Sequence, residues 1–520
     1  MQSKKTRRFI KKGKRGLIRV IFSRVGIISA LFLLNVFWMF YFVYLLGSKI
    51  ENIYWITKAL ELIFVIVVFN SKANPSSKLT WLLVVSIPLF GPMLYLYITS
   101  DLGHRKIKHK IESLQLESGS LIDQDDEAKQ DLEARDKGAY SIFSYIENNS
   151  SYNLYENTDV TYYKIGEELF ASMLEELEKA EHFIFLEYFI ISEGEMWDAI
   201  LDILKEKAKA GVEVRLMYDG FCEFSSIPRN YPKKLAEYGI KARPFFRLQP
   251  FVSTLYNYRD HRKIMVIDGK CGFTGGVNLA DEYINAEVRF GHWKDGGIRL
   301  KGEAVNTLTT LFLQLWGIFD KETSFEPYLV KENSEAKNEG FVIPFGTCPL
   351  EEDRIGEMVY LDMINRATES VEITTPYLIL DGEMLTALTF AAMRGVEVRM
   401  LLPGVPDKKS IYALSKTHYK ALISAGVHVY EYSPGFLHAK TIVADNKEAV
   451  VGTINFDYRS FYHHFECGVY MHSVPAIKDI SKDIEDTIKL SREVTFETIK
   501  KEKLITKVTG LVLKQFAPLL

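Results

Sequence analysis

Two short stretches of this 520-residue chain carry the same chemically active side chains at the same spacing. One reads His-Arg-Lys-Ile-Met-Val-Ile-Asp over residues 261–268, and the other His-Ala-Lys-Thr-Ile-Val-Ala-Asp over residues 438–445. After each His come a Lys at plus two, an Asp at plus seven, a Gly at plus fourteen and an Asn at plus seventeen. The matched residues are His261, Lys263, Asp268, Gly275 and Asn278, and His438, Lys440, Asp445, Gly452 and Asn455. Five matches at identical offsets indicate a duplicated site rather than two ordinary strand ends.

The spacing predicts a β-hairpin around each motif. Residues two apart on a strand share a face, so the His and Lys of each motif project together. A short apolar run typical of a buried strand follows each Lys, and Asp268-Gly269 and Asp445-Asn446 are hairpin-turn dipeptides. The return strands end in small residues, at 274–276 and 452–453, which we expect to leave room for a ligand. Each hairpin would then present an imidazole, an ammonium and an amide at one end.

Two such hairpins facing one another would form a site suited to a phosphodiester. Lys263, Lys440, Asn278 and Asn455 could hold the non-bridging oxygens. One imidazole could attack phosphorus while the other protonates the leaving oxygen. The turn positions of Asp268 and Asp445 favour an orienting or scaffolding role within this catalytic motif.

The sequence predicts no metal and no other cofactor. The pair His463-His464 lacks partnering ligands in the sequence. The four cysteines are far apart, without the spacing of a zinc site or a disulfide framework (Cys222, Cys271, Cys348 and Cys467).

Strands and helices alternate around the motifs in the same order twice. The first half is expected to have a strand at Phe183–Phe189, a helix through Lys209 and a strand at 211–217, and the second a strand at 371–380, a helix to Arg394 and a strand at 395–401. The two later strands share the sequence Gly-Val-Glu-Val-Arg. This alternation predicts parallel βαβ units. The fold class is therefore α/β, with two similar halves whose hairpins face one another.

The first hundred residues are basic and then apolar, which predicts a membrane anchor. The first 24 residues contain ten Lys or Arg and no acid, and the uncharged run 25–46 is long enough to span a bilayer. Segment 53–69 is shorter and contains Lys58 and Glu61, and segment 79–99 is uncharged but interrupted by Pro88, Gly91 and Pro92. A nucleic-acid-binding arm is the alternative for the basic start. The apolar run that follows at once favours the membrane.

Charge alone does not settle the membrane topology. The basic N-terminus favours the cytoplasmic side, and three full spans would then place the catalytic part outside. The basic residues after the last apolar segment also favour the inside (Arg105, Lys106, Lys108 and Lys110). We therefore expect a cytoplasmic catalytic domain, with segment 53–69 or 79–99 not crossing fully.

The expected divisions are membrane segments at 1–100, a polar and partly helical linker at 101–150, α/β halves at 151–330 and 331–475, and an amphipathic helical tail at 476–520. The lysines and aliphatic residues of the tail suit a membrane interface, although half-buried packing against the catalytic domain is equally compatible. The apolar stretch 247–256 before His261 is interpreted as a lid or lipid-facing rim, or as a longer surface loop.

Both motifs resemble the HxKxxxxD motif of the phospholipase D superfamily. The stretch 74–81, with Pro88, Gly91 and Tyr95, resembles the N-terminal membrane segment of bacterial cardiolipin synthases. The stretches 292–295 and 455–460, with Glu466, resemble those after the two motifs. Superfamily resemblance implies that Asp295 and Glu466 orient the catalytic imidazoles, with structural salt bridges as the alternative. Arg262 departs from the commoner small residue and is expected to face away from His261.

This resemblance implies a phosphatidyl transfer that needs no cofactor. One imidazole attacks the phosphorus of phosphatidylglycerol and releases glycerol, and a second phosphatidylglycerol then displaces the phosphatidyl group to give cardiolipin. By analogy, His261 is the nucleophile and His438 the acid–base group, in a multi-pass protein of the bacterial cell membrane.

The alternatives are a hydrolytic phospholipase D or another phosphatidyltransferase, a nuclease, and a membrane scaffold with an inactive site. The membrane segments and the net charge of −3 oppose a nucleic-acid partner. The two intact motifs oppose the scaffold.

Overall fold

The computed structural model describes residues 51–71, 75–87, 90–99, 104–122, 124–150, 152–247, 258–330, 339–351 and 353–517. The predicted span at 25–46 and most of the apolar stretch at 247–256 lie outside these residues. The described residues fall into two compact units, a larger one within 104–511 and a smaller one formed by 51–99 and 512–517.

Three apolar helices form most of the smaller unit: α3 (Glu51–Phe69), α4 (Pro75–Val85) and α5 (Phe90–Thr99). Trp81 of α4 and Phe64 of α3 both contact the ring of Tyr95 on α5 edge-on. The predicted segment 79–99 is divided between α4 and α5, as its Pro and Gly residues indicated. Within the described ranges, no helix combines the length and the apolar character needed to cross a bilayer.

The first half of the larger unit contains a seven-stranded sheet in the order β1-β9-β7-β6-β2-β3-β4. Its elements are β1 (Thr158–Tyr163), α9 (Gly166–Glu178), β2 (Phe183–Tyr188), α10 (Glu195–Lys209), β3 (Glu213–Asp219), α11 (Cys222–Ser225), α12 (Tyr231–Ala236), β4 (Lys241–Phe245), β5 (Arg259–Asp260), β6 (Lys263–Ile267), β7 (Cys271–Gly275), a 3-10 helix (Asp281–Ile284), β8 (His292–Lys294), β9 (Gly297–Gly302) and α13 (Val305–Gly317).

The second half contains a sheet in the order β10-β19-β17-β16-β11-β13-β14-β20, and β5 of the first half pairs with β19. Its elements are β10 (Phe341–Thr347), α14 (Ile355–Arg366), β11 (Ser370–Thr374), β12 (Leu378–Ile379), α15 (Gly382–Met393), β13 (Glu397–Pro403), α16 (Lys409–Ser424), β14 (His428–Tyr432), β15 (Gly435–Leu437), β16 (Thr441–Ala444), β17 (Glu448–Gly452), β18 (Phe456–Asp457), α17 (Tyr458–Tyr462), β19 (His464–His472), α18 (Ala476–Lys489), β20 (Ser491–Glu493), α19 (Phe496–Lys501) and α20 (Leu504–Lys514).

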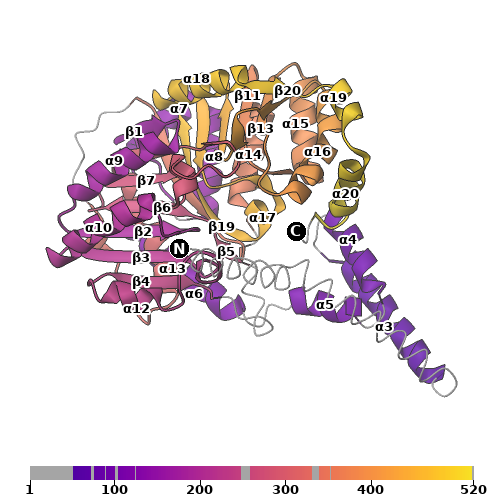
Figure 1. Ribbon diagram of the computed structural model, residues 1–520, viewed down its shortest axis with the longest axis horizontal. Helices are drawn as coiled ribbons and strands as arrows, with labels where there is room; N and C mark the ends of the chain where they lie inside the picture. Colours follow the sequence, from indigo (N-terminus) through magenta and orange to yellow (C-terminus); the bar gives the residue numbers. More distant parts are fainter. Residues whose placement is uncertain are drawn as a thin grey trace, which may run out of the picture. The chain divides into compact units, whose positions relative to one another are not determined.

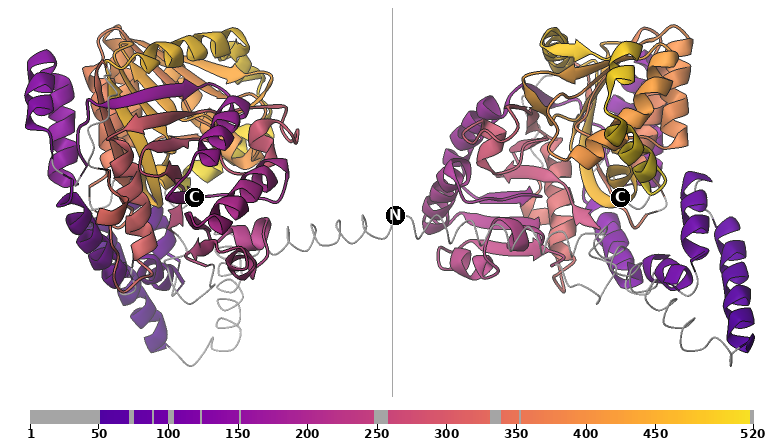
Figure 2. Two further views of the ribbon diagram at one scale, coloured as in Figure 1. Left: turned by 90° about the vertical axis from the view of Figure 1, so that its left-hand side faces the viewer. Right: turned by 45° about the vertical axis from the view of Figure 1, so that its right-hand side comes forward.

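The two sheets repeat one topology, which confirms the predicted duplication. The order β9-β7-β6-β2-β3-β4 of the first half corresponds to β19-β17-β16-β11-β13-β14 of the second. In each half the βαβ pair is parallel, β2 with β3 and β11 with β13, and the motif strand runs antiparallel to its neighbour. The two halves lie side by side, the first in magenta and the second in orange and yellow (Figures 1 and 2).

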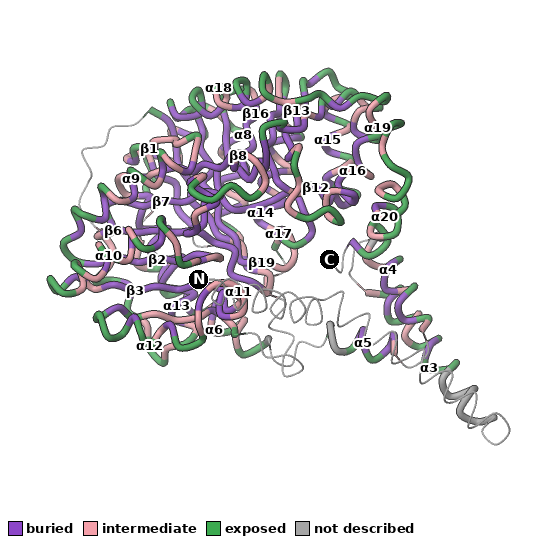
Figure 3. Tube along the Cα trace, in the orientation of Figure 1, coloured by how far each residue is buried: buried purple, intermediate pink, exposed green. Residues whose placement is uncertain are grey.

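One hydrophobic cluster joins the halves. Helix α13 is buried along its whole length, and its Phe312 stacks on Phe185 of β2 with ring centroids 4.6 Å apart. The same cluster contains residues of both motif hairpins, such as Val266 and Ile442. Most strand residues are buried, whereas the outer faces of α12 and α18 are exposed (Figure 3). This shared core fixes the position of one motif relative to the other.

The segment at 101–150, expected to be a polar and partly helical linker, is helical over most of its described residues, and residues 104–150 belong to the larger unit. It forms α6 (His104–Gly119), α7 (Asp126–Arg135) and α8 (Lys137–Asn149). Their buried apolar side chains, including Leu114, Leu132 and Phe143, belong to the cluster that joins the two halves. Because α6 and α7 contain many charged residues, the sequence indicated only part of the helical structure of this segment.

In the predicted helical tail at 476–520, α18 packs on strands of both halves and β20 pairs with β14, which agrees with the expected alternative of packing against the catalytic domain.

Candidate active site

Each motif occupies a hairpin whose turn matches the prediction. Asp268 and Gly269 have φ of 52° and 65°, and Asp445 and Asn446 both have φ of 51°, which is the backbone of a type I′ turn. The two aspartates bind backbone rather than an imidazole. Asp268 accepts the N–H groups of residues 181–183, and Asp445 those of residues 368–370, at 2.7–3.2 Å. They tie each hairpin to the strand beside it.

We expect Asp445→Ala to lower the free energy of unfolding by about 1–3 kcal/mol, because it removes the acceptor of three backbone N–H groups and places Ala at positive φ. Asp445→Asn, which keeps one oxygen and suits the turn, should lose less. Denaturant unfolding of both variants measures this order. An Ala variant as stable as the unsubstituted protein would contradict the scaffolding role.

The backbone around each motif His pairs with the other half of the molecule. Strand β5, which ends just before His261, runs parallel to β19, and the His261 N–H donates to the Phe465 carbonyl at 2.9 Å. Strand β15, which ends just before His438, runs parallel to β8, and the His438 N–H donates to the Lys294 carbonyl at 2.7 Å. The two halves are therefore joined directly at the two imidazoles.

This pairing places an acid of each half against the imidazole of the other half. Glu466 on β19 lies 2.8 Å from His261 Nδ1 through its Oε2, and Asp295 after β8 lies 2.6 Å from His438 Nδ1 through its Oδ2. Both acids are fully buried. A carboxylate that accepts the Nδ1 proton leaves the Nε2 lone pair for chemistry. The sequence identified both acids as candidates but did not indicate which imidazole each would meet.

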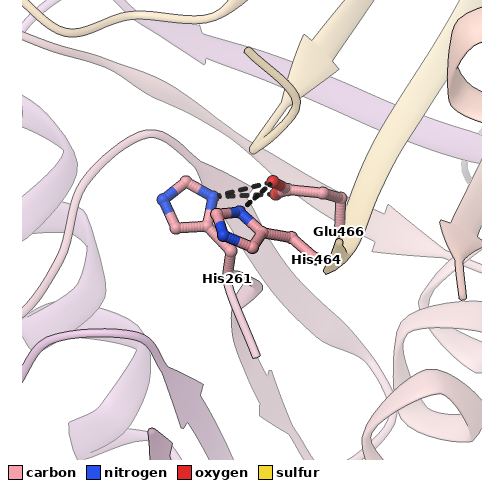
Figure 4. Close-up of side chains that lie close together, drawn as sticks. All are labelled: His261, His464 and Glu466. Atoms are coloured by element: carbon pink, nitrogen blue, oxygen red, sulfur yellow. Dashed lines mark hydrogen bonds and ion pairs between the residues drawn. The ribbon is translucent and has the colours of Figure 1, made fainter. Parts of the chain in front are cut away.

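Glu466 also contacts a second imidazole, whose role sequence reasoning missed. His464 Nδ1 lies 3.2 Å from Glu466 Oε1, and its ring centroid is 5.1 Å from that of His261 (Figure 4). The Thr453 hydroxyl donates to Glu466 Oε2 at 2.5 Å. The signal was the alternation of a strand, since residues 464 and 466 are two apart and share a face.

His261, His464 and Glu466 have ligand atoms within 4.8 Å of one another and could hold a metal ion. Two imidazoles and a carboxylate are a set that zinc uses in proteins. The sequence argued against a metal because His463 and His464 had no partnering ligands. In the structure His464 does have such partners, so that argument does not hold. The hydrogen bonds of Glu466 to both imidazoles also satisfy these atoms without a metal.

Two buried lysines complete the charged part of the site. Lys263 Nζ donates to the His261 carbonyl at 2.6 Å, and Lys440 Nζ donates to the His438 carbonyl and lies 2.9 Å from its Nδ1. Burial lowers the pKa of Lys263 to about 8 and that of Lys440 to about 7. A bound anionic phosphodiester would favour the charged form of both groups.

Both imidazoles are held neutral in the free site. Burial, followed by the charge of Lys263, lowers the pKa of His261 well below its ordinary value, and burial and Lys440 lower the pKa of His438 to about 4. Burial raises the pKa of Glu466. Burial alone would also raise the pKa of Asp295, but His438 and Lys440 hold it below its ordinary value. The electrostatic surroundings of the two imidazoles therefore differ, and the ionised Asp295 can stabilise an imidazolium at His438.

The two predicted amides differ in what they bind. Asn278 is engaged within its own half, where it accepts the Ile190 N–H at 2.9 Å and donates to the Tyr283 hydroxyl at 2.7 Å. The Tyr283 ring in turn contacts the His438 ring, with centroids 5.4 Å apart. Asn455 Oδ1 is buried and has no hydrogen-bond partner among the described residues.

The glycines at the ends of the return strands make room for protein rather than for a ligand, so that part of the prediction is wrong. A Cβ at Gly276 would collide with the Asp295 carboxylate, and one at Gly452 with the Cys467 carbonyl. Arg262, expected to face away from His261, donates to the Leu311 carbonyl of α13 at 3.0 Å.

The duplicated fold and paired motifs define the phospholipase D class, and comparisons with known proteins agree. The family described as "Cardiolipin synthase, PLD-like domain" matches residues 173–316 and 360–488, and "Phospholipase_D-nuclease N-terminal" matches residues 59–98. The chain belongs to the PLD-like cardiolipin synthase family.

Curated relatives match most of the chain. Cardiolipin synthase of Geobacillus sp. (strain WCH70) is 34% identical over 97% of this chain and 100% of its own, and cardiolipin synthase 2 of Bacillus anthracis is 33% identical over 87% and 89%. An uncharacterised protein of Streptococcus mutans is 48% identical over 88% and 99%. The crystal structure of phosphatidylserine synthase from Haemophilus influenzae Rd KW20 has a TM-score of 0.55 at 13% identity, covering 74% of this chain and 98% of that one, which shows a shared fold.

Proposed function

We propose that this enzyme transfers a phosphatidyl group between two phosphatidylglycerol molecules, giving cardiolipin and glycerol through a phosphatidyl-histidine intermediate. The observation that carries the proposal is the pair of imidazoles, each with its carboxylate from the opposite half and a buried lysine from its own motif. Relatives named cardiolipin synthase support the choice of substrate and product.

In the first step, His261 Nε2 attacks phosphorus and the bond to the glycerol oxygen breaks. Glu466 holds the Nδ1 proton of His261, so the attacking nitrogen is neutral. His438, made more basic by the anionic substrate and by Asp295, donates a proton to the leaving glycerol. Lys263 and Lys440, with Asn278 and Asn455, would hold the non-bridging oxygens.

In the second step, neutral His438 accepts the proton of a hydroxyl on a second phosphatidylglycerol. That oxygen attacks phosphorus and the bond to His261 breaks, which restores the free site. The ionised Asp295 beside His438, which can stabilise an imidazolium there, supports this division of roles.

A product assay tests the function. Purified protein in phosphatidylglycerol bilayers should give cardiolipin and free glycerol as main products, with phosphatidic acid minor. A chelator should leave the rate unchanged. Mainly phosphatidic acid would replace the synthase with a hydrolytic phospholipase D, and loss with the chelator that a divalent ion restores would place a metal in the mechanism.

We expect kcat/KM to fall both below and above neutral pH. Both declines should occur at lower pH than the ordinary pKa values of histidine and lysine would give. On the alkaline side the ammonium groups lose their protons as pH rises through about 7–8, because burial has lowered the pKa of Lys440 and Lys263. On the acid side, protonation of His261 inactivates the nucleophile only well below the ordinary histidine pKa. A rate profile measured at low substrate reports these free-enzyme values.

The matched variant for this profile is Lys440→Arg, which stays charged throughout that range. The residual kcat/KM of this variant should still fall at acid pH. At alkaline pH it should no longer show the part of the fall that deprotonation of Lys440 causes. An unsubstituted enzyme with constant kcat/KM up to pH 9 would contradict the assignment.

We further propose that the protein is a bacterial membrane protein whose N-terminal segments hold a cytoplasmic catalytic unit near its lipid substrate. The apolar run 25–46 and the match at residues 59–98 support the anchoring.

A further inference from the structure

The C-terminal helix α20 turns its apolar side chains outward. Leu504, Ile505, Val508, Leu511 and Val512 recur at the spacing of one helix face, and their side chains are 51–76% exposed. We call these five residues the apolar stripe. In a domain surrounded by water such a stripe would face the core. A contiguous exposed stripe of this kind marks an interaction surface.

Packing against α16 fixes this orientation. Gly510 is the only residue of α20 that is buried, and a Cβ there would collide with the Ala413 carbonyl and lie 2.8 Å from Thr417 Cγ2, both on α16. Glu502, just before the helix, forms an ion pair with Lys416 of α16. The side of α20 at Gly510 therefore contacts α16, and the five residues of the apolar stripe remain exposed; most of the α20 backbone is coloured as exposed or intermediate in Figure 3.

Several lysines lie on α20 or in the residues just before it. Residues 500–514 contain five lysines and a single acid, and that acid is the Glu502 engaged by Lys416. The lysines are Lys500, Lys501, Lys503, Lys507 and Lys514. Lysines beside an exposed aliphatic face suit anionic headgroups above acyl chains. They do not suit a second copy of the same face, because like charges would meet.

The last residues of α20, from Val512, and those that follow belong to the smaller unit. Gln515, just after the helix, accepts a hydrogen bond from the Thr80 hydroxyl of α4 at 2.7 Å. Helices α3 and α4 also expose large apolar side chains, including Leu62, Ile66 and Leu79. The chain beyond the apolar stripe thus belongs to the same compact unit as these apolar N-terminal helices.

We propose that α20 is a membrane-docking helix that lies in the interface of an anionic bilayer, with the apolar stripe among the acyl chains and the lysines at the headgroups. The choice of an anionic lipid rests on the proposed function, because phosphatidylglycerol carries a negative charge. Docked in this way, α20 would hold the catalytic unit against the surface that supplies both substrates.

A fluorescent probe on the apolar stripe tests the docking without relying on activity. The full-length chain with Val508→Cys is labelled with an environment-sensitive dye, since the four native cysteines are buried. Glu397→Cys, on an exposed residue at the start of β13, is the matched control. In phosphatidylglycerol vesicles the dye at 508 should shift to the blue and be quenched by lipids spin-labelled near the headgroup, and the dye at 397 should do neither.

Two other results would overturn the proposal. An unshifted dye at 508 in phosphatidylglycerol vesicles would show that the stripe does not enter the bilayer. A shift without lipid that grows with protein concentration would show that the stripe binds a second copy.

An activity comparison separates docking from catalysis. Replacing Leu504, Ile505, Val508 and Leu511 with Ser should lower cardiolipin formation in vesicles at least tenfold while leaving it unchanged for substrate in detergent micelles. An unchanged rate in vesicles would count against docking by α20. Equal losses in both would also overturn the proposal, because the stripe would then support the fold. If the unsubstituted protein forms no cardiolipin but the dye at 508 still shifts, the proposed function fails and the docking stands.

Discussion

Replacing either His261 or His438 with Ala should abolish cardiolipin formation, with a loss well beyond the roughly 10²–10⁴-fold that one acid–base group contributes. The reason is that both steps of the proposed mechanism use both imidazoles. His261 must form and then release the phosphorus–nitrogen bond, and His438 must first donate and then accept a proton. His109→Ala, at a side chain 76% exposed on α6, is the matched control and should keep full turnover. A near-normal rate in either site variant would contradict a site shared between the halves.

The same two variants can separate the roles of the imidazoles. A phosphodiester with a leaving group that needs no proton allows the first step without an acid. His438→Ala should then form a labelled phosphatidyl-enzyme that persists, because no base activates the acceptor, and His261→Ala should form none. Mass analysis of the trapped peptide measures this directly. Label on residue 438 in the His261 variant would reverse the assignment.

Much of the fold was predictable because its signals are local. The apolar run of residues 264–267 between Lys263 and Asp268 indicated a buried strand, and the dipeptide at 268–269 indicated a tight turn. The structure has β6 and a type I′ turn there. The segment of α6 to α8 was expected to be only a partly helical linker, because the apolar residues of α6 and α7, such as Ile111 and Leu132, lie among charged ones. The composition of this segment resembled a linker, although the helical spacing was present.

The arrangement of the site could not be predicted, because it depends on pairing between halves. The two motifs are nearly symmetric in sequence, so nothing local decides whether Glu466 meets His261 or His438. That choice follows from the pairing of β5 with β19 and of β15 with β8. These strands have only two and three residues, too short to show a pattern. His464 was missed for a related reason, since its contact with His261 exists only after this pairing.

Glu466 and Asp295 each contact the imidazole of the other half, so replacing either acid should have a second large effect on turnover. The effect on the covalent intermediate should differ between the two acids. Glu466→Gln and Asp295→Asn should each lower turnover by about 10²–10⁴-fold, because an amide holds the Nδ1 proton of a neighbouring imidazole poorly. In the proposed mechanism Glu466 serves the nucleophile His261, so its variant should form the phosphatidyl-enzyme slowly and accumulate little of it. Asp295 serves His438, so its variant should form the intermediate from the activated substrate and then accumulate it, because the acceptor hydroxyl is not activated.

Asp445→Asn provides the matched acid-to-amide change in the motif but away from the imidazoles, and it should accumulate no more intermediate than the unsubstituted enzyme. Unfolding midpoints of all three variants separate lost stability from lost chemistry. If each acid instead served the imidazole of its own half, the two trapping results would be exchanged. Accumulation in Glu466→Gln but not in Asp295→Asn is therefore the outcome that would rule out the crossed site with these roles.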